Sequence, residues 1–156
     1  MRVLFVCTGN ICRSPTAEAV VRQLAADRTD LPALAFASVG TTGYHVGEPP
    51  DPRAQAAAAR RGYDLSDLRA AKLARPDFQR CDLLLAMDKG HLRQMSRLAP
   101  PAAADKLRLF LDFAPGPAEE VPDPYYGGEA GFETMLDLIE AGAHGLLAAI
   151  AVGEVR

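Results

Sequence analysis

Residues 3–15 read VLFVCTGNICRSP, and this stretch decides the fold of the chain. A short apolar run predicts a buried strand that ends in Cys7, and a tight loop then leads into a helix. The backbone N–H groups of such a loop point inward, and the dipole of the following helix adds partial positive charge. The stretch therefore predicts a loop that holds an anion, with a cysteine directly beneath it.

The side chains of this loop indicate that the anion is a phosphate. Arg13 carries a planar guanidinium that can hold two phosphate oxygens at once. The positive field of the loop favours the thiolate form of Cys7, which is the nucleophilic form. A bare Cys-x5-Arg pattern is weak, but here the cysteine ends a strand and the arginine precedes a helix. We therefore expect an enzyme in which sulfur attacks phosphorus.

The other residues of the loop suit a tight turn. Gly9 allows a positive φ angle, and Asn10 tolerates the left-handed conformation. Ser14 and Pro15 are expected to be the N-cap and the first residue of the helix. An ordinary strand-to-helix turn with a solvated arginine is the structural alternative to a phosphate site. Apolar residues follow at helical spacing: Ala17, Val20, Val21 and Leu24.

Strands alternate with helices along the rest of the chain. Further strands are expected at residues 34–39, 82–87 and 107–111, the last at an edge of the sheet. Helices are expected at residues 15–26, 52–61, 74–79, 89–98 and about 132–151, with a Pro/Gly-rich loop at 115–128. This alternation predicts an α/β sandwich with a mostly parallel sheet and a site at the carboxyl ends of its strands. We expect a single domain spanning residues 1–156.

The composition is that of an ordinary globular protein. The chain has 156 residues and a net charge of −3, which argues against a nucleic-acid partner. No segment suggests a signal peptide or approaches a membrane span, so no membrane partner is expected. Three cysteines are an odd number, and a nucleophilic cysteine must stay reduced. We therefore expect a cytoplasmic location, with a monomer as the simplest state.

The chain resembles the low-molecular-weight protein tyrosine phosphatase family. The resemblance rests on VCTGNICRSP at residues 6–15 and on DPYY at residues 123–126. It extends over GYHVGEPPDPR at residues 43–53 and Met-Asp at 87–88, and so covers essentially the whole chain. It implies a three-layer sandwich with a four-stranded parallel sheet flanked by helices and a phosphate-binding loop after the first strand. It also implies a phosphatase that needs no cofactor and acts on a phosphotyrosine-containing protein or a small aryl phosphate.

The resemblance assigns roles to the matching residues. Cys7 is expected to form a phosphocysteine, Arg13 to stabilise the transition state, and Asp123 to act as general acid and then as base. On its own the Asp-Pro pair would be an ordinary turn, and Asp112 and Glu120 are the alternative acids. Backbone N–H groups expected to bind the phosphate oxygens belong to Thr8, Gly9, Asn10, Ile11, Cys12 and Arg13.

Polar side chains are expected to support the loop. Ser14 is expected to donate a hydrogen bond to the thiolate, which is compatible with its role as N-cap. Asn10 is expected to be strained, and in the family a serine at the position of Ser38 helps to hold it. Many relatives carry a histidine after a serine where this chain has Ser66 and Asp67. We therefore expect an altered bond to Asn10 or to the loop.

The entrance of the pocket is expected to be apolar and aromatic. Such walls suit a planar aryl phosphate, although tyrosines in turns are also often half-buried surface. Family members directed at phosphoarginine carry threonine at the position of Ile11, where a hydroxyl can meet the guanidinium. Ile11 therefore favours the aryl ester. The residues expected to line the entrance are Ile11, Tyr44, Tyr125 and Tyr126.

The remaining cysteines and histidines have weaker signals. In the family a second loop cysteine can form a reversible disulfide with the nucleophile, so Cys12 is expected either to protect Cys7 or simply to fill the loop. Cys81 is expected to be a small residue at a strand start. No metal site is expected, because the histidines share no ligand spacing and do not cluster with aspartates 51, 82 and 88. These histidines are His45, His91 and His144.

Other functions fit parts of the pattern. A thiol-linked arsenate reductase shares the fold but needs a downstream cysteine pair, and only Cys81 follows the loop. A binding module without turnover would not need Cys7, Arg13 and Asp123 together. A phosphoryl carrier would need neither the arginine nor the acid. A phosphoarginine phosphatase is a further alternative. The sequence favours a protein-tyrosine phosphatase and leaves its physiological substrate open.

Overall fold

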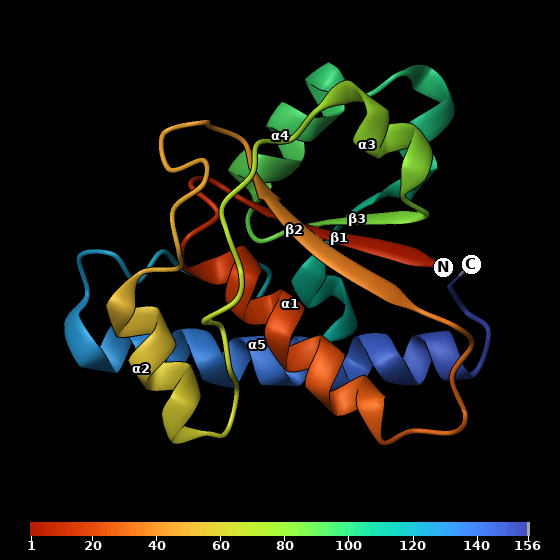
Figure 1. The fold of residues 1–156 in the computed structure, drawn as a ribbon. Coiled ribbons are helices and arrows are strands. Elements are labelled where there is room, and N and C mark those ends of the chain that lie inside the picture. The colour runs from red at the N-terminus through yellow and green to blue at the C-terminus, as the bar shows by residue number, and fades with distance from the viewer. Residues whose placement is uncertain (156) are drawn as a thin grey trace.

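A parallel sheet forms the centre of the computed structural model, which describes residues 1–155 (Figure 1). Its strands are β1 (Arg2–Cys7), β2 (Ala35–Gly40), β3 (Leu83–Ala86) and β4 (Leu107–Leu109). The order across the sheet is β2-β1-β3-β4, and every neighbouring pair is parallel. The predicted parallel sheet with its last strand at an edge is confirmed. β4 is shorter than predicted, because the chain turns at Phe110 into a 3₁₀ helix, Phe110–Phe113.

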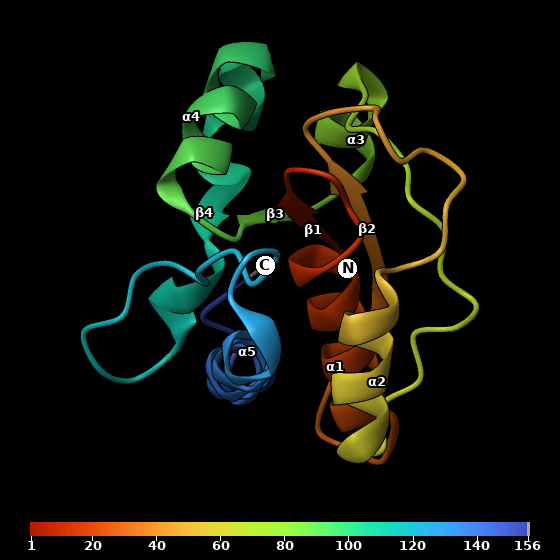
Figure 2. The same ribbon diagram turned by 90° about the vertical axis from the view of Figure 1, so that its left-hand side faces the viewer.

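Helices cover both faces of the sheet and complete the three layers (Figures 1 and 2). On one side lie α1 (Arg13–Ala26), α2 (Pro52–Arg60) and α5 (Gly128–Ala151). On the other side lie α3 (Arg75–Arg80) and α4 (Lys89–Leu98), with a 3₁₀ helix at Pro101–Lys106. The predicted α/β sandwich is therefore confirmed.

The central strand β1 explains the two cores. Its side chains alternate, so that Val3 and Phe5 join the core beneath α1 and α5, whereas Leu4 and Val6 join the core beneath α3 and α4. All four are at most 2% exposed. A strand that is buried on both faces reads as a continuous apolar run, and its end is held rigidly. Cys7 stands at that end.

The long helix α5 corrects one expectation. By length and composition Gly128–Ala151 could cross a membrane, although no segment was expected to approach a span. In the structure 50% of its most apolar window is buried, and the helix packs against α1, α2 and Phe110–Phe113. Core helices of soluble proteins can be equally long and apolar. The position of α5 in this core therefore explains its composition.

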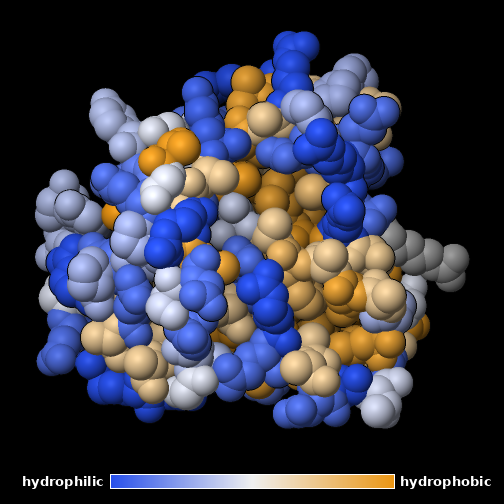
Figure 3. All heavy atoms as spheres, in the orientation of Figure 1, coloured by the Kyte–Doolittle hydropathy of each residue, from blue (hydrophilic) through white to orange (hydrophobic). Residues whose placement is uncertain are grey.

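β2 forms an edge of the sheet beside β1, and only its last residue, Gly40, pairs with the segment around Lys72. Ala35 and Ala37 are exposed there, and apolar atoms follow the course of β2 between polar side chains (Figure 3). Arg22 from α1 donates a hydrogen bond to the carbonyl oxygen of Phe36, 2.8 Å away. A charged side chain that occupies an edge carbonyl protects the edge from pairing with another strand.

Candidate active site

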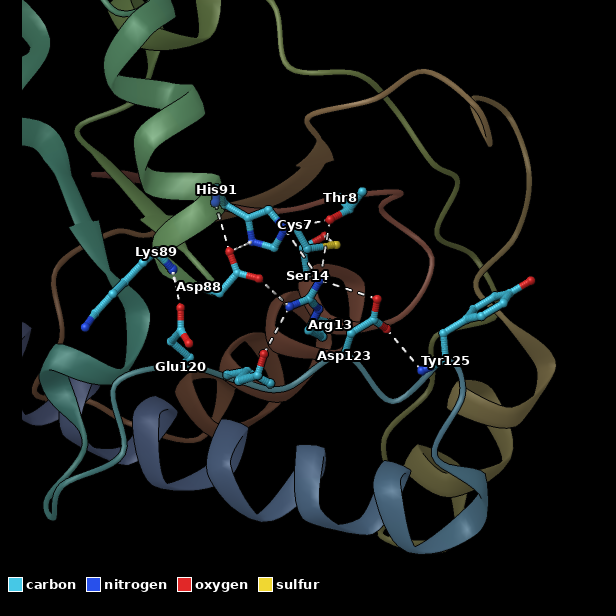
Figure 4. Close-up of polar contacts among 11 residues, drawn as sticks. Cys7, Thr8, Arg13, Ser14, Asp88, Lys89, His91, Glu120, Asp123 and Tyr125 are labelled. Carbon is cyan, nitrogen blue, oxygen red and sulfur yellow. Dashed lines mark hydrogen bonds and ion pairs between the residues drawn. The ribbon is translucent and has the colours of Figure 1, made fainter.

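The loop from Cys7 to Arg13, called the phosphate loop below, joins β1 to α1 at the carboxyl edge of the sheet (Figure 4). Its first half packs on the end of β2. A Cβ atom on Gly40 would lie 2.5 Å from the carbonyl oxygen of Thr8, so only glycine admits this approach. The N–H of Thr41 also donates to the carbonyl oxygen of Cys7 at 2.8 Å. The neighbouring strand thus fixes the start of the loop.

The helix after the loop begins earlier than predicted. α1 starts at Arg13 with Cys12 at the N-cap position, and no side chain caps it. The prediction that Ser14 is the N-cap is therefore wrong. Its hydroxyl points into the interior instead, where its Oγ lies 2.9 Å from the Sγ of Cys7. Backbone N–H groups that no side chain caps at a helix N-terminus are suited to an anion.

Asn10 has the left-handed conformation that was predicted, with a φ of 58°. Its amide nitrogen donates to the Oγ of Ser14 at 2.8 Å and to the Oγ of Ser38 at 2.9 Å. Its amide oxygen accepts from the N–H of Ala71 at 2.9 Å. Every polar atom of this buried amide group is therefore satisfied, which offsets the strain of the backbone.

Gly9 serves a different purpose from the one predicted. It is absent from the glycines with positive φ in residues 1–155, so the prediction of a conformational role is wrong. A Cβ atom here would lie 3.0 Å from Cδ2 of His45. Gly9 therefore makes room for the imidazole of His45, a neighbour of the loop that the sequence analysis had not placed there.

The support of Asn10 extends through Ser38 to a buried carboxylate. Ser38 donates to Oε1 of Glu18 at 2.7 Å, and Glu18 is 6% exposed. Asp67, in contrast, is exposed and makes no hydrogen bond or ion pair within residues 1–155. Asp67 therefore makes no bond to Asn10 or to the phosphate loop, and Asn10 is held instead by Ser38 and by the backbone N–H of Ala71. Glu18 was not among the predicted site residues, although it lies within the first turns of α1 and faces β2.

The guanidinium of Arg13 is anchored on one side. Its Nη1 donates to Oδ2 of Asp88 at 2.9 Å and to the carbonyl oxygen of Val121 at 3.0 Å. Its Nη2 has only longer contacts, namely 3.4 Å to Nε2 of His91, 3.5 Å to Oγ1 of Thr8 and 3.8 Å to Oδ2 of Asp123. One nitrogen is thus fixed, and the other remains available to a ligand.

Asp88 and Asp123 lie on either side of the guanidinium of Arg13 (Figure 4). The side chain of Asp123 is 53% exposed, and its Oδ1 accepts from the N–H of Tyr125 at 3.0 Å. Burial would raise the pKa of Asp88, but the hydrogen bonds from the backbone N–H of His91 and from the charged Arg13 lower it below its usual value. Asp88 is therefore an ion partner for Arg13, and Asp123 is the carboxyl group open to a ligand.

The alternative acids are engaged elsewhere. An oxygen of Glu120 accepts the backbone N–H of Lys89 at the start of α4, 2.8 Å away. Asp112 is on the 3₁₀ helix after β4, and its carboxylate lies 3.8 Å from the guanidinium of Arg108. Of the three candidate acids, only Asp123 approaches Arg13.

His91 is a component of the site that the sequence analysis did not identify. The ring is buried, and its Nε2 lies 2.7 Å from Oγ1 of Thr8. Its Nδ1 lies 3.1 Å from Oδ1 of Asp88 without good hydrogen-bond alignment. The expectation that the histidines do not cluster with aspartates is wrong for this pair, which follows from their i,i+3 spacing at the start of α4. In residues 1–155 no three such side chains are grouped to hold a metal ion.

The aromatic residues differ in how firmly they are held. Tyr125 is 40% exposed, and the guanidinium of Arg53 lies 5.0 Å from its ring centre. Tyr126 packs edge-on against Tyr125 with ring centres 5.0 Å apart, but it is 94% exposed. Tyr44 is 88% exposed on the loop after β2. Ile11 is partly buried against the core beneath α1. Ile11 and Tyr125 are therefore the better-packed members of the expected entrance.

The two cysteines of the phosphate loop have different environments. Burial, together with the nearby Asp51 and Cys7, raises the pKa of Cys12 to about 12, so Cys12 remains a thiol. Cys7 instead faces the hydroxyl of Ser14. Both are free, as is Cys81. The predicted protective disulfide between Cys7 and Cys12 stays a prediction.

Comparisons with known proteins identify the family that the chain is similar to. Residues 2–154 match the family model described as low molecular weight phosphotyrosine protein phosphatase. A low molecular weight protein-tyrosine-phosphatase of Streptomyces coelicolor is 49% identical, over 96% of this chain and 93% of the relative. A protein tyrosine phosphatase of Entamoeba histolytica is 34% identical with a TM-score of 0.95, over 99% of both chains. The Drosophila arginine phosphatase is 29% identical with a TM-score of 0.88, over 95% of this chain and 96% of that one.

Proposed function

The chain belongs to the low molecular weight phosphotyrosine protein phosphatase family, a family of hydrolases, and from that premise we propose how it acts. It hydrolyses phosphotyrosine monoesters in two steps through a phosphocysteine on Cys7. Arg13 binds the transferring phosphoryl group, and Asp123 moves the proton. A phosphotyrosine-containing protein or a small aryl phosphate is the substrate, and no cofactor takes part.

In the first step the Cys7 thiolate attacks phosphorus. A bond forms between Sγ and phosphorus while the bond from phosphorus to the phenolic oxygen breaks. The N–H groups of the phosphate loop and the free Nη2 of Arg13 receive the charge on the equatorial oxygens. Asp123 in its protonated form gives its proton to the leaving phenolate.

In the second step Asp123 acts as a base. Its carboxylate takes a proton from a water molecule as that water attacks phosphorus, and the bond from phosphorus to sulfur breaks. The hydroxyl of Ser14 donates to the departing thiolate. Because Ser14 accepts the amide N–H of Asn10, its own hydrogen is directed away from Asn10. Of the two acceptors left to it, Sγ at 2.9 Å is closer than the carbonyl oxygen of Val39 at 3.4 Å.

One observation carries this proposal. The anchored guanidinium of Arg13 presents its free nitrogen toward Asp123, 3.8 Å away, the one exposed carboxylate in contact with it among residues 1–155. Cys7 lies at the base of the same loop and contacts Ser14. A nucleophile, a cation for the phosphoryl oxygens and an acid for the leaving group therefore converge.

The arsenate reductase alternative fits the chain poorly. Its relay would require a disulfide to pass from the phosphate loop to downstream cysteines. Cys81 is the one downstream cysteine, and it precedes β3 beside the N-terminal end of β1, where the N–H of Asp82 donates to Arg2. Cys7 stands at the opposite end of that strand. The sulfurs of Cys7 and Cys81 therefore lie at opposite ends of the strands, Cys7 at the carboxyl ends and Cys81 at the amino ends.

The phosphoarginine alternative depends on a smaller difference. The similarity to the Drosophila arginine phosphatase supports keeping it as the second candidate. Ile11 offers an apolar side chain to the entrance, which suits an aryl ring better than a guanidinium. The free cysteines favour a reducing compartment, and we propose the cytoplasm, with a monomer as the working unit.

The test compares three phosphopeptides of one sequence that carry phosphotyrosine, phosphoserine or phosphoarginine. We expect turnover of phosphotyrosine, abolished in Cys7→Ser and lowered on the order of a hundredfold or more in Asp123→Ala. Ile11→Thr is expected to shift the ratio of kcat/KM toward phosphoarginine. Faster turnover of phosphoarginine by the wild type would replace the proposal with the second candidate, and no turnover of any peptide would refute both.

A further inference from the structure

We infer that His91 is a positioning residue for Arg13 and acts through the hydroxyl of Thr8. The inference rests on the proposed function, because it concerns how the same guanidinium is aimed at the phosphoryl group. His91 comes from the first turn of α4, whereas Thr8 comes from the phosphate loop, so two distant parts of the chain meet at this contact (Figure 4).

The contacts of the ring assign its tautomer. Nδ1 lies 3.1 Å from the carboxylate of Asp88, and although the two are poorly aligned for a hydrogen bond, the negative charge favours the proton on that nitrogen. Nε2 is then unprotonated and accepts the hydroxyl hydrogen of Thr8 at 2.7 Å. With its hydrogen directed at His91, the oxygen of Thr8 turns its lone pairs toward Nη2 of Arg13, 3.5 Å away.

Burial beside the guanidinium of Arg13 keeps the ring neutral. Burial and the charge of Arg13 lower the pKa of His91 to about 4, while Asp88, Asp123 and Glu120 act in the opposite direction. A protonated Nε2 would place an N–H group against the guanidinium nitrogen 3.4 Å away. In the neutral ring the lone pair of Nε2, which accepts the hydroxyl of Thr8, also faces that nitrogen, and no N–H group competes there.

These two acceptors complement the anchors of the guanidinium. Asp88 and Val121 fix Nη1 by short hydrogen bonds. His91 and Thr8 attract Nη2 from one side at longer distances, which aligns it without occupying it. Misplacement of a catalytic group by about 1 Å can cost on the order of a hundredfold in rate. Loss of this alignment should therefore affect the transition state more than the binding of the ground state.

The test is a double-mutant cycle of Thr8→Val and His91→Leu. For each variant we would measure kcat and KM with p-nitrophenyl phosphate, and inhibition by inorganic phosphate and by orthovanadate, which adopts the five-coordinate geometry of the transition state. Each single variant should lower kcat and orthovanadate affinity roughly tenfold, with KM and phosphate inhibition nearly unchanged. The double variant should be no worse than the poorer single one.

Two further variants separate positioning from packing. His91→Gln retains an acceptor within reach of Thr8 and should recover most of kcat, whereas His144→Leu, at an exposed histidine of α5, should match the wild type. Thr8→Val changes an exposed side chain and leaves the core intact.

The inference is overturned if Thr8→Val keeps the wild-type kcat and orthovanadate affinity, or if the two losses multiply in the double variant. Equal losses of phosphate and orthovanadate affinity would also overturn it. An inactive wild type would refute the proposed function instead, and the orthovanadate comparison would still decide the role of His91.

Discussion

The hydroxyl oxygen of Ser14 lies 2.9 Å from the sulfur of Cys7 and receives a hydrogen bond from Asn10 at 2.8 Å. One side chain therefore links the expected nucleophile to the strained residue of the phosphate loop. This arrangement explains why a serine in the first turn of α1 does not cap its own helix. The capping position would turn the hydroxyl away from the sulfur.

Replacement of Ser14 by alanine should lower kcat for p-nitrophenyl phosphate by about tenfold to a hundredfold. The variant loses the donor to the departing thiolate and the acceptor for Asn10. Steady-state kinetics would measure the effect. Ser96→Ala on α4, where the hydroxyl donates only to the carbonyl of Leu92, is the matched control. A Ser14→Ala enzyme as fast as this control would contradict the role of the contact.

Arg53 should affect the step that needs the general acid. Asp51 holds its guanidinium, which donates to the carbonyl oxygen of Tyr125 at 2.9 Å and so braces the segment after Asp123. Arg53→Met should therefore slow hydrolysis of phenyl phosphate more than that of p-nitrophenyl phosphate, because the poorer leaving group depends more on its proton.

The matched control for Arg53 is Arg60→Met, since Arg60 on the same helix pairs with Glu133 at the surface. Steady-state kinetics with both substrates would give the ratio of kcat for phenyl phosphate to kcat for p-nitrophenyl phosphate. An unchanged ratio in Arg53→Met would show that the brace does not position the acid.

Much of the fold could be predicted from the sequence, because its elements have strong local signals. The apolar run of β1 and the start of α4 after Asp88 are examples, and Asp88 does accept the N–H of His91 as an N-cap. The predictions for Gly9 and Ser14 failed because they used only what each residue type favours locally, a positive φ for glycine and a helix N-cap for serine. Contacts with His45 and with Cys7, which lie outside the local sequence, decide both positions.

The candidate site was predictable only where one motif contained it. Cys7, Asn10 and Arg13 lie within a single loop, so their proximity follows from the sequence. The contact between His91 and Thr8 joins residues 83 positions apart, and no periodicity indicates it. The same holds for the carboxylate of Glu18, which extends the support of Asn10 only because β2 places Ser38 beside it.

Two glycines of α5 should respond in opposite ways to alanine. A Cβ atom on Gly145 would lie 1.7 Å from the carbonyl oxygen of Phe113. Gly145→Ala should therefore lower the free energy of unfolding by about 3 kcal/mol. The nearest neighbours of a Cβ atom on Gly131 are 3.7 Å away. Gly131→Ala should therefore raise the free energy of unfolding by about 0.5–1 kcal/mol, because alanine favours a helix more than glycine does.

Urea unfolding of the two variants would measure both changes. Equal stability of Gly145→Ala and the wild type would contradict the close packing of α5 on Phe113.

His91 should make stability depend on pH. Its pKa is lowered from 6.5 to about 4, chiefly by burial and then by Arg13, so the unfolded chain binds a proton before the folded protein does. Neutral His91 therefore makes its full contribution to the free energy of unfolding above about pH 6.5. This contribution, up to about 3 kcal/mol, is lost as the pH falls toward 4.

Urea unfolding between about pH 7 and pH 4.5 would test this, with His91→Gln as the reference because it retains the carboxylates. The wild type should lose more stability than His91→Gln over this range. Equal losses in the two proteins would contradict a buried neutral ring.

The most direct test of the account is the identity of the phosphorylated residue during turnover. Asp123→Ala would be mixed with p-nitrophenyl phosphate, whose leaving group needs little help from an acid, and quenched rapidly in alkaline denaturant. Mass spectrometry of the peptides should find the phosphoryl group on Cys7, and none there in Cys7→Ser. Release of p-nitrophenol with Cys7 unmodified, or with the phosphoryl group on another residue, would contradict the proposed mechanism.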